Sequence, residues 1–378
     1  MDSQSGFAQN KRSSKMNILP TPWSVEAVTA GWLNYALSRF DKFEKFHIED
    51  ISYEMISQGK GFSGEVWRLS LSYADKDNQN SPKNIVAKFA SRVPATRKLV
   101  KSYALNEVEV YRNIATTSGK IFPEFYFADS DSDYGDICIL MEDLSCEYPA
   151  SNIEGLSLAD AITATESIAA FHALWWNVKG LNWLRPRRAH SDFLRKLFVS
   201  SGISFLEIYG DLISRDFRSL VEEYPAKIPT IMSDFSQPPI TVGHGDFRPD
   251  NFFFRNTDSD HSNTIAIDWQ LTTITKGIRD ISYMTAWGIP VESQSDWEGE
   301  ILESYLGSLS NSNVSNYSKQ ELEWDYRLGF FSAFQVLVIA STNLENETQR
   351  GEDLVKVVND RMDSIIQNYD LLALLRKL

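Results

Sequence analysis

The chain has 378 residues, of which 43% are hydrophobic and 23% are charged, a composition typical of a folded protein with two domains or lobes. Its formal net charge of −14 gives no support for binding the phosphate backbone of a nucleic acid. Its only cysteines, Cys138 and Cys146, are too few for a disulfide framework and favour a reducing, cytoplasmic compartment. No apolar stretch approaches the ~20 residues that a spanning helix needs. Residues 1–15 have no secretory apolar core, so we expect neither membrane insertion nor export.

Residues 1–20 are expected to form a disordered tail, and residues 21–143 are predicted to form a small, β-rich lobe. A helical pattern begins near Ser24, which is placed to cap it. A second helix is predicted near Leu99–Ala115. The strands of this lobe are predicted, from their β-branched and aromatic residues, at Val66–Leu71, Ile85–Phe89, Phe125–Ala128 and Ile137–Met141.

Beyond Leu144 the pattern becomes helical, and residues 144–378 are predicted to form a larger lobe. Its helices are predicted at Leu158–Trp176, Phe193–Tyr209, Leu212–Tyr224, Trp297–Leu309, Lys319–Ala340 and Asp353–Leu375. Two short strands, Ile240–Val242 and Thr264–Ile267, lie between these helices. The sequence therefore predicts a two-lobed α+β fold.

The strongest chemical signal is the sequence HGDFRPDN over residues 244–251, directly after a predicted strand. Asp246 and Asn251 have the spacing D-x-x-x-x-N, which supplies a carboxylate near an attacking hydroxyl and a neutral oxygen ligand for a metal ion. The second short strand ends at Asp268, where another metal ligand belongs. Two unrelated surface turns would not explain this order, spacing and strand context together.

A glycine-rich turn lies upstream, between two strand-like runs. Gly59, Gly61 and Gly64 would let the backbone approach phosphate groups closely, and the Ser63 hydroxyl can donate a hydrogen bond. Taken alone, the same pattern also fits a hairpin that binds no ligand.

Lys88 lies in the apolar predicted strand Ile85–Phe89, where it either extends from an edge toward water or is held for an anionic partner. The helix that follows offers two acidic candidates, Glu107 and Glu109. The buried stripe of that helix is set by Ala104, Val108, Tyr111 and Ala115. Glu107 falls on this stripe and Glu109 does not, so Glu107 is predicted to pair with Lys88.

These motifs resemble the aminoglycoside phosphotransferase/choline kinase-like superfamily, whose fold is similar to that of protein kinases. HGDFRPDNFFF with AIDWQ looks most like the ecdysteroid kinase-like branch and the kinase-type domains related to those fused to acyl-CoA dehydrogenases. Three further segments extend the resemblance, Thr29–Leu37, Phe171–Trp176 and Gly277–Met284. The resemblance covers about Pro22 to Leu372.

The resemblance implies that Asp246 is the catalytic base and that Asn251 and Asp268 bind Mg²⁺. It implies that Lys88, paired with Glu107, holds the phosphates of ATP. Nucleotide-binding residues are implied in the glycine-rich turn and in the hinge between the lobes, namely Gly59, Gly61, Ser63, Gly64, Met141, Glu142 and Leu144.

Arg248 is either close enough to reach the γ-phosphate or paired with Asp250 or Asp280. His172 and Asp280 are expected to be structural residues around the catalytic segment. The sequence departs from protein kinases at Gly245, where an arginine is usual, and at Trp269-Gln270, where Phe-Gly is usual. Both departures favour a constitutively assembled small-molecule kinase.

We therefore expect a kinase that uses ATP and Mg²⁺ to phosphorylate a hydroxyl of a small molecule, which is apolar or amphipathic, such as a sterol, a terpenoid or a hydroxyacyl compound. A first alternative is a kinase for a cationic substrate such as an aminoglycoside or choline, and a more distant one is a catalytically inactive binding module. Carboxylates lining the pocket around residues 280–330 would favour the cationic substrate, whereas aromatic residues would favour the apolar one. Neither a nucleic-acid nor a particular protein partner is indicated.

Overall fold

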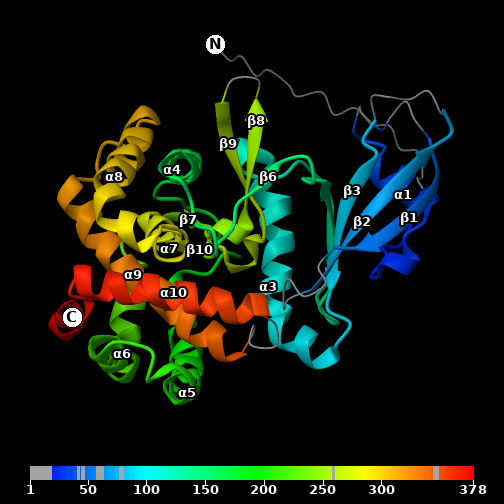
Figure 1. The fold of residues 1–378 in the computed structure, drawn as a ribbon. Helices are drawn as coiled ribbons and strands as arrows, with labels where there is room; N and C mark the ends of the chain where they lie inside the picture. Colours follow the sequence, from blue (N-terminus) through cyan, green and yellow to red (C-terminus); the bar gives the residue numbers. More distant parts are fainter. Residues whose placement is uncertain are drawn as a thin grey trace, which may run out of the picture.

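The computed structural model describes residues 19–40, 43, 47–56, 64–75, 81–257, 260–343 and 349–378. These residues form the two lobes of the predicted α+β fold, with the β-rich lobe beside the helical one (Figure 1). Most of the expected tail, up to residue 18, lies outside the described residues. In the part of the chain that the structure describes, no helix is both long and apolar enough to cross a lipid bilayer.

The N-terminal lobe is an antiparallel sheet with a helix on each face. In sheet order, its strands are β1 (Ile48–Met55), β2 (Gly64–Tyr73), β3 (Asn84–Ala90), β5 (Asp136–Glu142) and β4 (Phe125–Asp131). Helix α1 (Ala30–Leu37) packs on the face that carries Ile85, Ala87 and Phe89. Helix α3 (Pro94–Asn113) packs on the opposite face, with Val86 and Ala90. Because side chains alternate along a strand, Lys88 lies on the α3 face.

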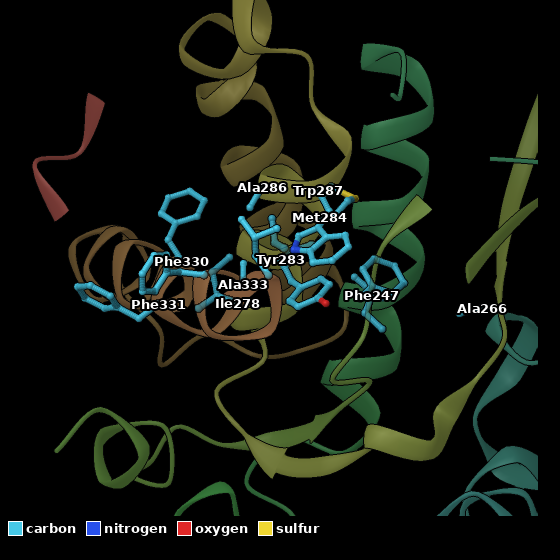
Figure 2. Close-up of a cluster of buried hydrophobic side chains, with 14 of the residues drawn as sticks. Phe247, Ala266, Ile278, Tyr283, Met284, Ala286, Trp287, Phe330, Phe331 and Ala333 are labelled. Carbon is cyan, nitrogen blue, oxygen red and sulfur yellow. The ribbon is translucent and has the colours of Figure 1, made fainter. Parts of the chain in front are cut away.

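The C-terminal lobe is built around a buried central helix, α7 (Ile278–Gly288), in which every residue is buried. The other helices are α4 (Leu158–Leu174), α5 (Ser191–Tyr209), α6 (Arg215–Asp234), α8 (Gln294–Asn311), α9 (Lys319–Asn343), α10 (Gln349–Asn368) and α11 (Leu371–Lys377). Figure 2 shows Tyr283 and Trp287 of α7 in one buried cluster with Phe330 and Phe331 of α9. Buried aromatic and aliphatic surface of this kind dominates the stability of a lobe.

Short strands bring the predicted motifs close together. Strand β7 (Thr241–Gly243) pairs with β10 (Thr273–Thr275) and leads into residues 244–251, which contain the predicted catalytic motif and which we therefore call the catalytic loop. Strands β8 (Phe252–Thr257) and β9 (Asp260–Ala266) then form a hairpin that returns the chain to Asp268, and β6 (Tyr148–Pro149) pairs with β8. The hairpin therefore places the two ends of the HGD…ID pattern side by side.

The first helix begins later than the sequence predicts. Ser24 precedes only a short 3₁₀ turn, Val25–Ala27, and its side chain makes no capping hydrogen bond. Helix α1 instead begins after Thr29, whose hydroxyl oxygen accepts a hydrogen bond from the backbone N–H of Trp32 at 3.1 Å. The chain is extended at Val28 between these two segments, so the helical pattern is interrupted there.

Two predictions in the helical lobe were wrong in extent. Helix α6 runs to Asp234, although Pro225 and Pro229 lie inside it and each removes a helical N–H donor. The single helix predicted over Asp353–Leu375 is instead two helices, α10 and α11. They are separated at Asp370, which adopts φ 47° and caps α11 by accepting from the N–H of Ala373.

Candidate active site

The catalytic loop holds the Asp246 carboxylate in a buried position at its centre. The Asn251 side-chain N–H groups donate to both the backbone oxygen and Oδ2 of Asp246, each at 2.9 Å. Burial alone would raise the pKa of Asp246, but the charge of Arg248 and these hydrogen bonds lower it below its ordinary value. Asp246 is therefore ionised at neutral pH, as a proton acceptor must be.

Asp280, in the first turn of α7, binds the backbone of the catalytic loop. One carboxylate oxygen accepts from the N–H of His244 at 2.6 Å and the other from the N–H of Gly245 at 3.0 Å. His172 lies 3.3 Å from the same carboxylate, and its other ring nitrogen lies 2.9 Å from the Tyr305 hydroxyl. The predicted structural contact of Asp280 with the loop is therefore confirmed, and His172 supports Asp280.

His244 has one tautomer that satisfies both of its ring nitrogens. Its Nδ1 accepts from the N–H of Asp246 at 3.1 Å, and its Nε2 lies 3.0 Å from the carbonyl oxygen of Ile267. A carbonyl oxygen only accepts, so the proton must be on Nε2. Burial lowers the pKa of His244, which keeps the ring neutral. His244 thus ties the catalytic loop to the strand that precedes Asp268.

Gly245 is required by the local backbone. Its φ is +90°, and a Cβ atom there would lie 2.2 Å from the carbonyl oxygen of Leu271. A side chain would therefore be strained and would also collide with the segment after Asp268. This explains in physical terms why the sequence has no arginine at this position.

Three charged side chains, Lys88, Glu107 and Asp268, meet between the lobes and form what we call the ion triad. The Lys88 ammonium lies 2.7 Å from one Glu107 oxygen and 2.9 Å from an oxygen of Asp268. Glu109 is exposed and pairs with Arg112 on the outer side of α3. The predicted contact between Lys88 and Glu107 is confirmed, and so is the helical phase from which it was predicted.

The ion triad has one positive charge against two carboxylates. Burial and the charge of Asp268 raise the pKa of Glu107 to about 7, although Lys88 opposes this shift. Burial would lower the pKa of Lys88, but Asp268 and Glu107 more than reverse this effect and raise it. Lys88 therefore stays protonated, whereas Glu107 exchanges its proton near neutral pH.

Asp268 and Asn251 present oxygen atoms that suit Mg²⁺. Asp268 has a left-handed backbone conformation, with φ 65°, the kind of strain found where a side chain must be aimed. The carbonyl oxygen of Asn251 accepts from the N–H of Ile267 at 3.0 Å, which holds the two residues together. The Asn251 amide must turn its N–H groups to Asp246, because both atoms it contacts there are acceptors. Its oxygen is left for a cation, and two protein oxygens with phosphate and water complete a usual Mg²⁺ set.

The segment after Asp268 is fixed by aromatic packing. Trp269 is fully buried, stacks on Phe122 with ring centroids 3.9 Å apart, and donates to the Ala266 carbonyl oxygen at 2.8 Å. Asn106 of α3 also donates to the carbonyl oxygens of Gln270 and Thr272. These contacts connect the segment to both lobes and oppose the flipping that Phe-Gly sequences allow.

The predicted nucleotide-binding residues are described only in part. Gly59, Gly61 and Ser63 lie outside the described residues, while Gly64 begins β2, where a Cβ atom would lie 2.3 Å from the Phe89 carbonyl oxygen. In the hinge, two apolar side chains are buried, those of Met141 and Leu144.

Glu142, between these two hinge residues, already has partners in the protein. Its carboxylate pairs with Arg255 at 2.7 Å, and its backbone N–H donates to the carbonyl oxygen of Glu124 at 2.9 Å. Arg255 belongs to β8, so this pair connects the hinge to the C-terminal lobe. Neither the carboxylate nor the N–H of Glu142 is left for adenine.

Two aromatic residues of α7, Tyr283 and Trp287, extend the site beyond the predicted residues. Their rings stack at an interplanar angle of 8° (Figure 2), and the Tyr283 hydroxyl interacts with the Asp246 carboxylate. The Arg248 guanidinium lies 5.2 Å from the centre of the Trp287 ring and 3.3 Å from Asp246, and it is 3.7 Å from Asp250. Every residue of α7 is buried, so its sequence has no polar and apolar faces from which this aromatic wall could have been predicted.

A cavity of about 460 Å³ lies away from Asp246. Its walls include Lys276, Trp324 and three acidic residues, Glu321, Glu323 and Asp325. Lys276 follows Thr275, which pairs with Thr241 at the start of β7, whereas the catalytic loop follows the other end of that strand. This cavity is therefore separate from the catalytic loop.

Comparisons with known proteins identify the family and the fold of the chain. A family model described as the ecdysteroid kinase-like family matches residues 58–315. Two solved structures have the same fold at 11% sequence identity, and each alignment covers 89% of this chain and 99% of the other. One is an aminoglycoside phosphotransferase in complex with GDP and kanamycin, with a TM-score of 0.50. The other is the GDP complex of a wild-type aminoglycoside 2′-phosphotransferase, with a TM-score of 0.51. A search of curated proteins finds no match.

Proposed function

The chain belongs to the ecdysteroid kinase-like family and is a small-molecule phosphotransferase, and we propose that it uses ATP with Mg²⁺ to phosphorylate an alcohol hydroxyl. The observation that carries this proposal is the convergence of Asp246, Asn251, Lys88 and Asp268 between the two lobes. They supply a base, two oxygen ligands and a phosphate-binding cation, the set that phosphoryl transfer requires.

In the proposed mechanism, the ionised Asp246 orients the acceptor hydroxyl and accepts its proton. Lys88, held by Glu107, binds the α- and β-phosphate oxygens of ATP. Asn251 and Asp268 would hold Mg²⁺, which neutralises charge on the β- and γ-phosphates when bound. These residues form no covalent bond with the substrate, so positioning and charge neutralisation supply most of the rate enhancement.

The environment of Asp246 favours an apolar or amphipathic acceptor over a cationic one. Tyr283 and Trp287 provide an aromatic wall next to the base. Of the buried acidic residues between 280 and 330 in the described chain, Asp280 binds the catalytic loop and Asp325 pairs with Lys276 at 2.8 Å. Neither is free to bind an ammonium group of a substrate.

The proposal is tested by the Mg²⁺ dependence of nucleotide binding. We expect ATP to raise the unfolding temperature of the parent protein more with Mg²⁺ than without it, because a bound ligand stabilises the folded state. Asp268→Ala should remove the extra stabilisation by Mg²⁺. Asp133→Ala, an exposed aspartate on a turn, should retain it. An identical Mg²⁺-dependent shift in Asp268→Ala and parent would refute the metal role.

The acceptor class is tested with the purified protein, ATP and Mg²⁺ against a set of hydroxylated compounds, with ADP release as the measurement. The set should contain neutral amphipathic alcohols, hydroxy acids and amino alcohols. Faster ADP release with amphipathic compounds than with amino alcohols is the expected result. A clear preference for aminoglycosides or choline would favour the alternative substrate class.

A further inference from the structure

Arg187 is a buried cation without a partner of its own. Arg187 is the first residue of the short 3₁₀ turn Arg187–His190, and only 7% of its surface is exposed. Within the described residues its guanidinium donates no hydrogen bond and has no ion pair, and its Nε atom is both buried and unsatisfied. Its neighbours Arg185 and Arg188 are exposed, as is usual for arginine. Because a buried charge is costly unless it is paired, Arg187 needs an explanation.

The backbone places Arg187 close to the catalytic loop. Pro186 forms a parallel bridge with Ile274 of β10, and Ile274 pairs with Val242 of β7. The Thr273 hydroxyl donates to the carbonyl oxygen of Arg185 at 2.7 Å, which fixes this segment. Neighbouring strands are ~4.8 Å apart, so the chain at Pro186 lies roughly 10 Å from the strand that leads into the catalytic loop.

A second buried guanidinium, that of Arg279, lies in the same region. Its Nε donates to the Ser332 hydroxyl at 2.6 Å and its Nη2 contacts the carbonyl oxygen of Gly245 at 3.4 Å, whereas its Nη1 has no hydrogen bond. The nearest carboxylate, that of Asp280, is 3.9 Å away and already accepts from the catalytic loop. Arg279 therefore adds a second positive charge near Arg187 and does not offset the first.

The charge on Arg187 persists at neutral pH. Burial and the charge of Arg279 lower the pKa of Arg187 to about 9, so the guanidinium remains protonated at pH 7. Besides Arg279, the groups that interact with its charge include His190 and the hydroxyls of Tyr103, Tyr224 and Tyr283. Burial raises the pKa of each of these phenols. The phenols are therefore neutral and cannot balance the cation.

We propose that Arg187 binds an oxyanion group of the acceptor, a carboxylate or a sulfate or phosphate ester. The Tyr283 hydroxyl interacts electrostatically with both Asp246 and Arg187, so it relates this cation to the catalytic loop. A guanidinium binds an oxyanion through paired N–H groups, which suits the unsatisfied donors here. The acceptor would then be a hydroxylated amphipathic acid. The assignment of this oxyanion to the acceptor rests on the proposed function, whereas the anion site itself does not.

The test measures anion binding directly, with sulfate and acetate as probes. Unfolding temperatures are compared in sodium sulfate, sodium acetate and sodium chloride at equal ionic strength, with saturating Mg²⁺ and ADP to occupy the nucleotide phosphate site. We expect sulfate or acetate to raise the unfolding temperature above the chloride reference. The stronger of the two probes identifies the geometry of the bound group. The ADP-dependent shift in the same samples reports on the proposed function independently.

Arg187→Met should weaken the affinity for the effective probe at least tenfold. Without the probe, this variant should unfold at the same or a higher temperature than the parent, because an unpaired buried charge has been removed. Arg188→Met makes the same chemical change at the next, exposed residue and should behave like the parent. Arg187→Lys retains the charge but loses the paired donors, so its affinity should lie between these two.

Three results would overturn the proposal. One is a parent protein that responds to neither probe beyond chloride. Another is an Arg187→Met variant that keeps the full anion-dependent shift. The third is an Arg187→Met variant that is unfolded or markedly less stable without anions while Arg187→Lys is fully stable, which would assign Arg187 a structural role.

Discussion

The catalytic loop and the ion triad lie side by side but are held in different ways. The catalytic loop is fixed by hydrogen bonds within the C-terminal lobe, in which Asp280 binds two backbone N–H groups and His244 binds the strand before Asp268. The ion triad joins Lys88 and Glu107 of the N-terminal lobe to Asp268 of the C-terminal lobe. Its geometry therefore depends on how the lobes meet.

This difference separates two tasks of a phosphotransferase. The base must be positioned before substrate arrives, because preorganised groups cost no rearrangement during the reaction. Asp268, in contrast, contacts Lys88 and, in the proposed function, would also hold a metal ion. A catalytic loop with buried, complete hydrogen bonds suits the first task, and an exchangeable ion pair suits the second.

The largest effect is expected from a substitution in the catalytic loop. Asp246→Asn should lower kcat by the ~10²–10⁴-fold typical of losing a general base, while ATP binding remains because the ion triad is untouched. Steady-state kinetics with an identified acceptor and nucleotide titrations measure the two effects. Unchanged turnover would show that Asp246 is not the base.

The next largest effect is expected on stability, which substitutions in the two regions should change by different amounts. Asp280→Ala leaves two buried backbone N–H groups and His172 without their acceptor and should cost about 3–5 kcal/mol of unfolding free energy. Asp268→Ala leaves Lys88 paired with Glu107 and should change stability by less than ~1 kcal/mol. Chemical denaturation of both variants measures this contrast. Equal losses would mean that Asp268 is as structural as Asp280.

The ion triad should also give the protein a pH dependence that the catalytic loop lacks. Glu107 must be ionised to hold Lys88, and its pKa is raised from 4.5 to about 7. The value of kcat/KM for ATP should therefore fall as pH drops below about 7. Stability should change in the opposite sense, because a carboxyl with a raised folded-state pKa contributes stability that is lost as pH rises through that value. Both slopes should disappear in Glu107→Gln.

The smallest effect is expected at Glu109, on the same helix as Glu107. Glu109 lies two residues from Glu107, so it points about 200° away and pairs with Arg112 at the surface. Glu109→Gln should change stability by no more than ~0.5 kcal/mol and should keep the pH profile of the parent. Measured beside Glu107→Gln, it provides the matched control. A reversed ranking of the two variants would contradict the geometry of α3.

Local patterns in the sequence were sufficient to predict the two lobes, the positions of the motifs and the pairing of Lys88 with Glu107. In each case periodicity or spacing directly reports which side chains share a face. The break at Asp370 and the continuation of α6 through Pro225 were not predictable in this way, since tertiary packing decides them. Tyr283 and Arg187 were missed for a similar reason. Their roles depend on contacts between segments far apart in the chain, which no local pattern records.

Gly245 has a consequence for how this enzyme can evolve. Its left-handed backbone and the Leu271 carbonyl oxygen exclude any side chain unless both segments change together. The arginine that receives a phosphorylated loop in protein kinases therefore cannot arise here by a single substitution. A phosphorylation switch that depends on this position would need coordinated changes in both segments.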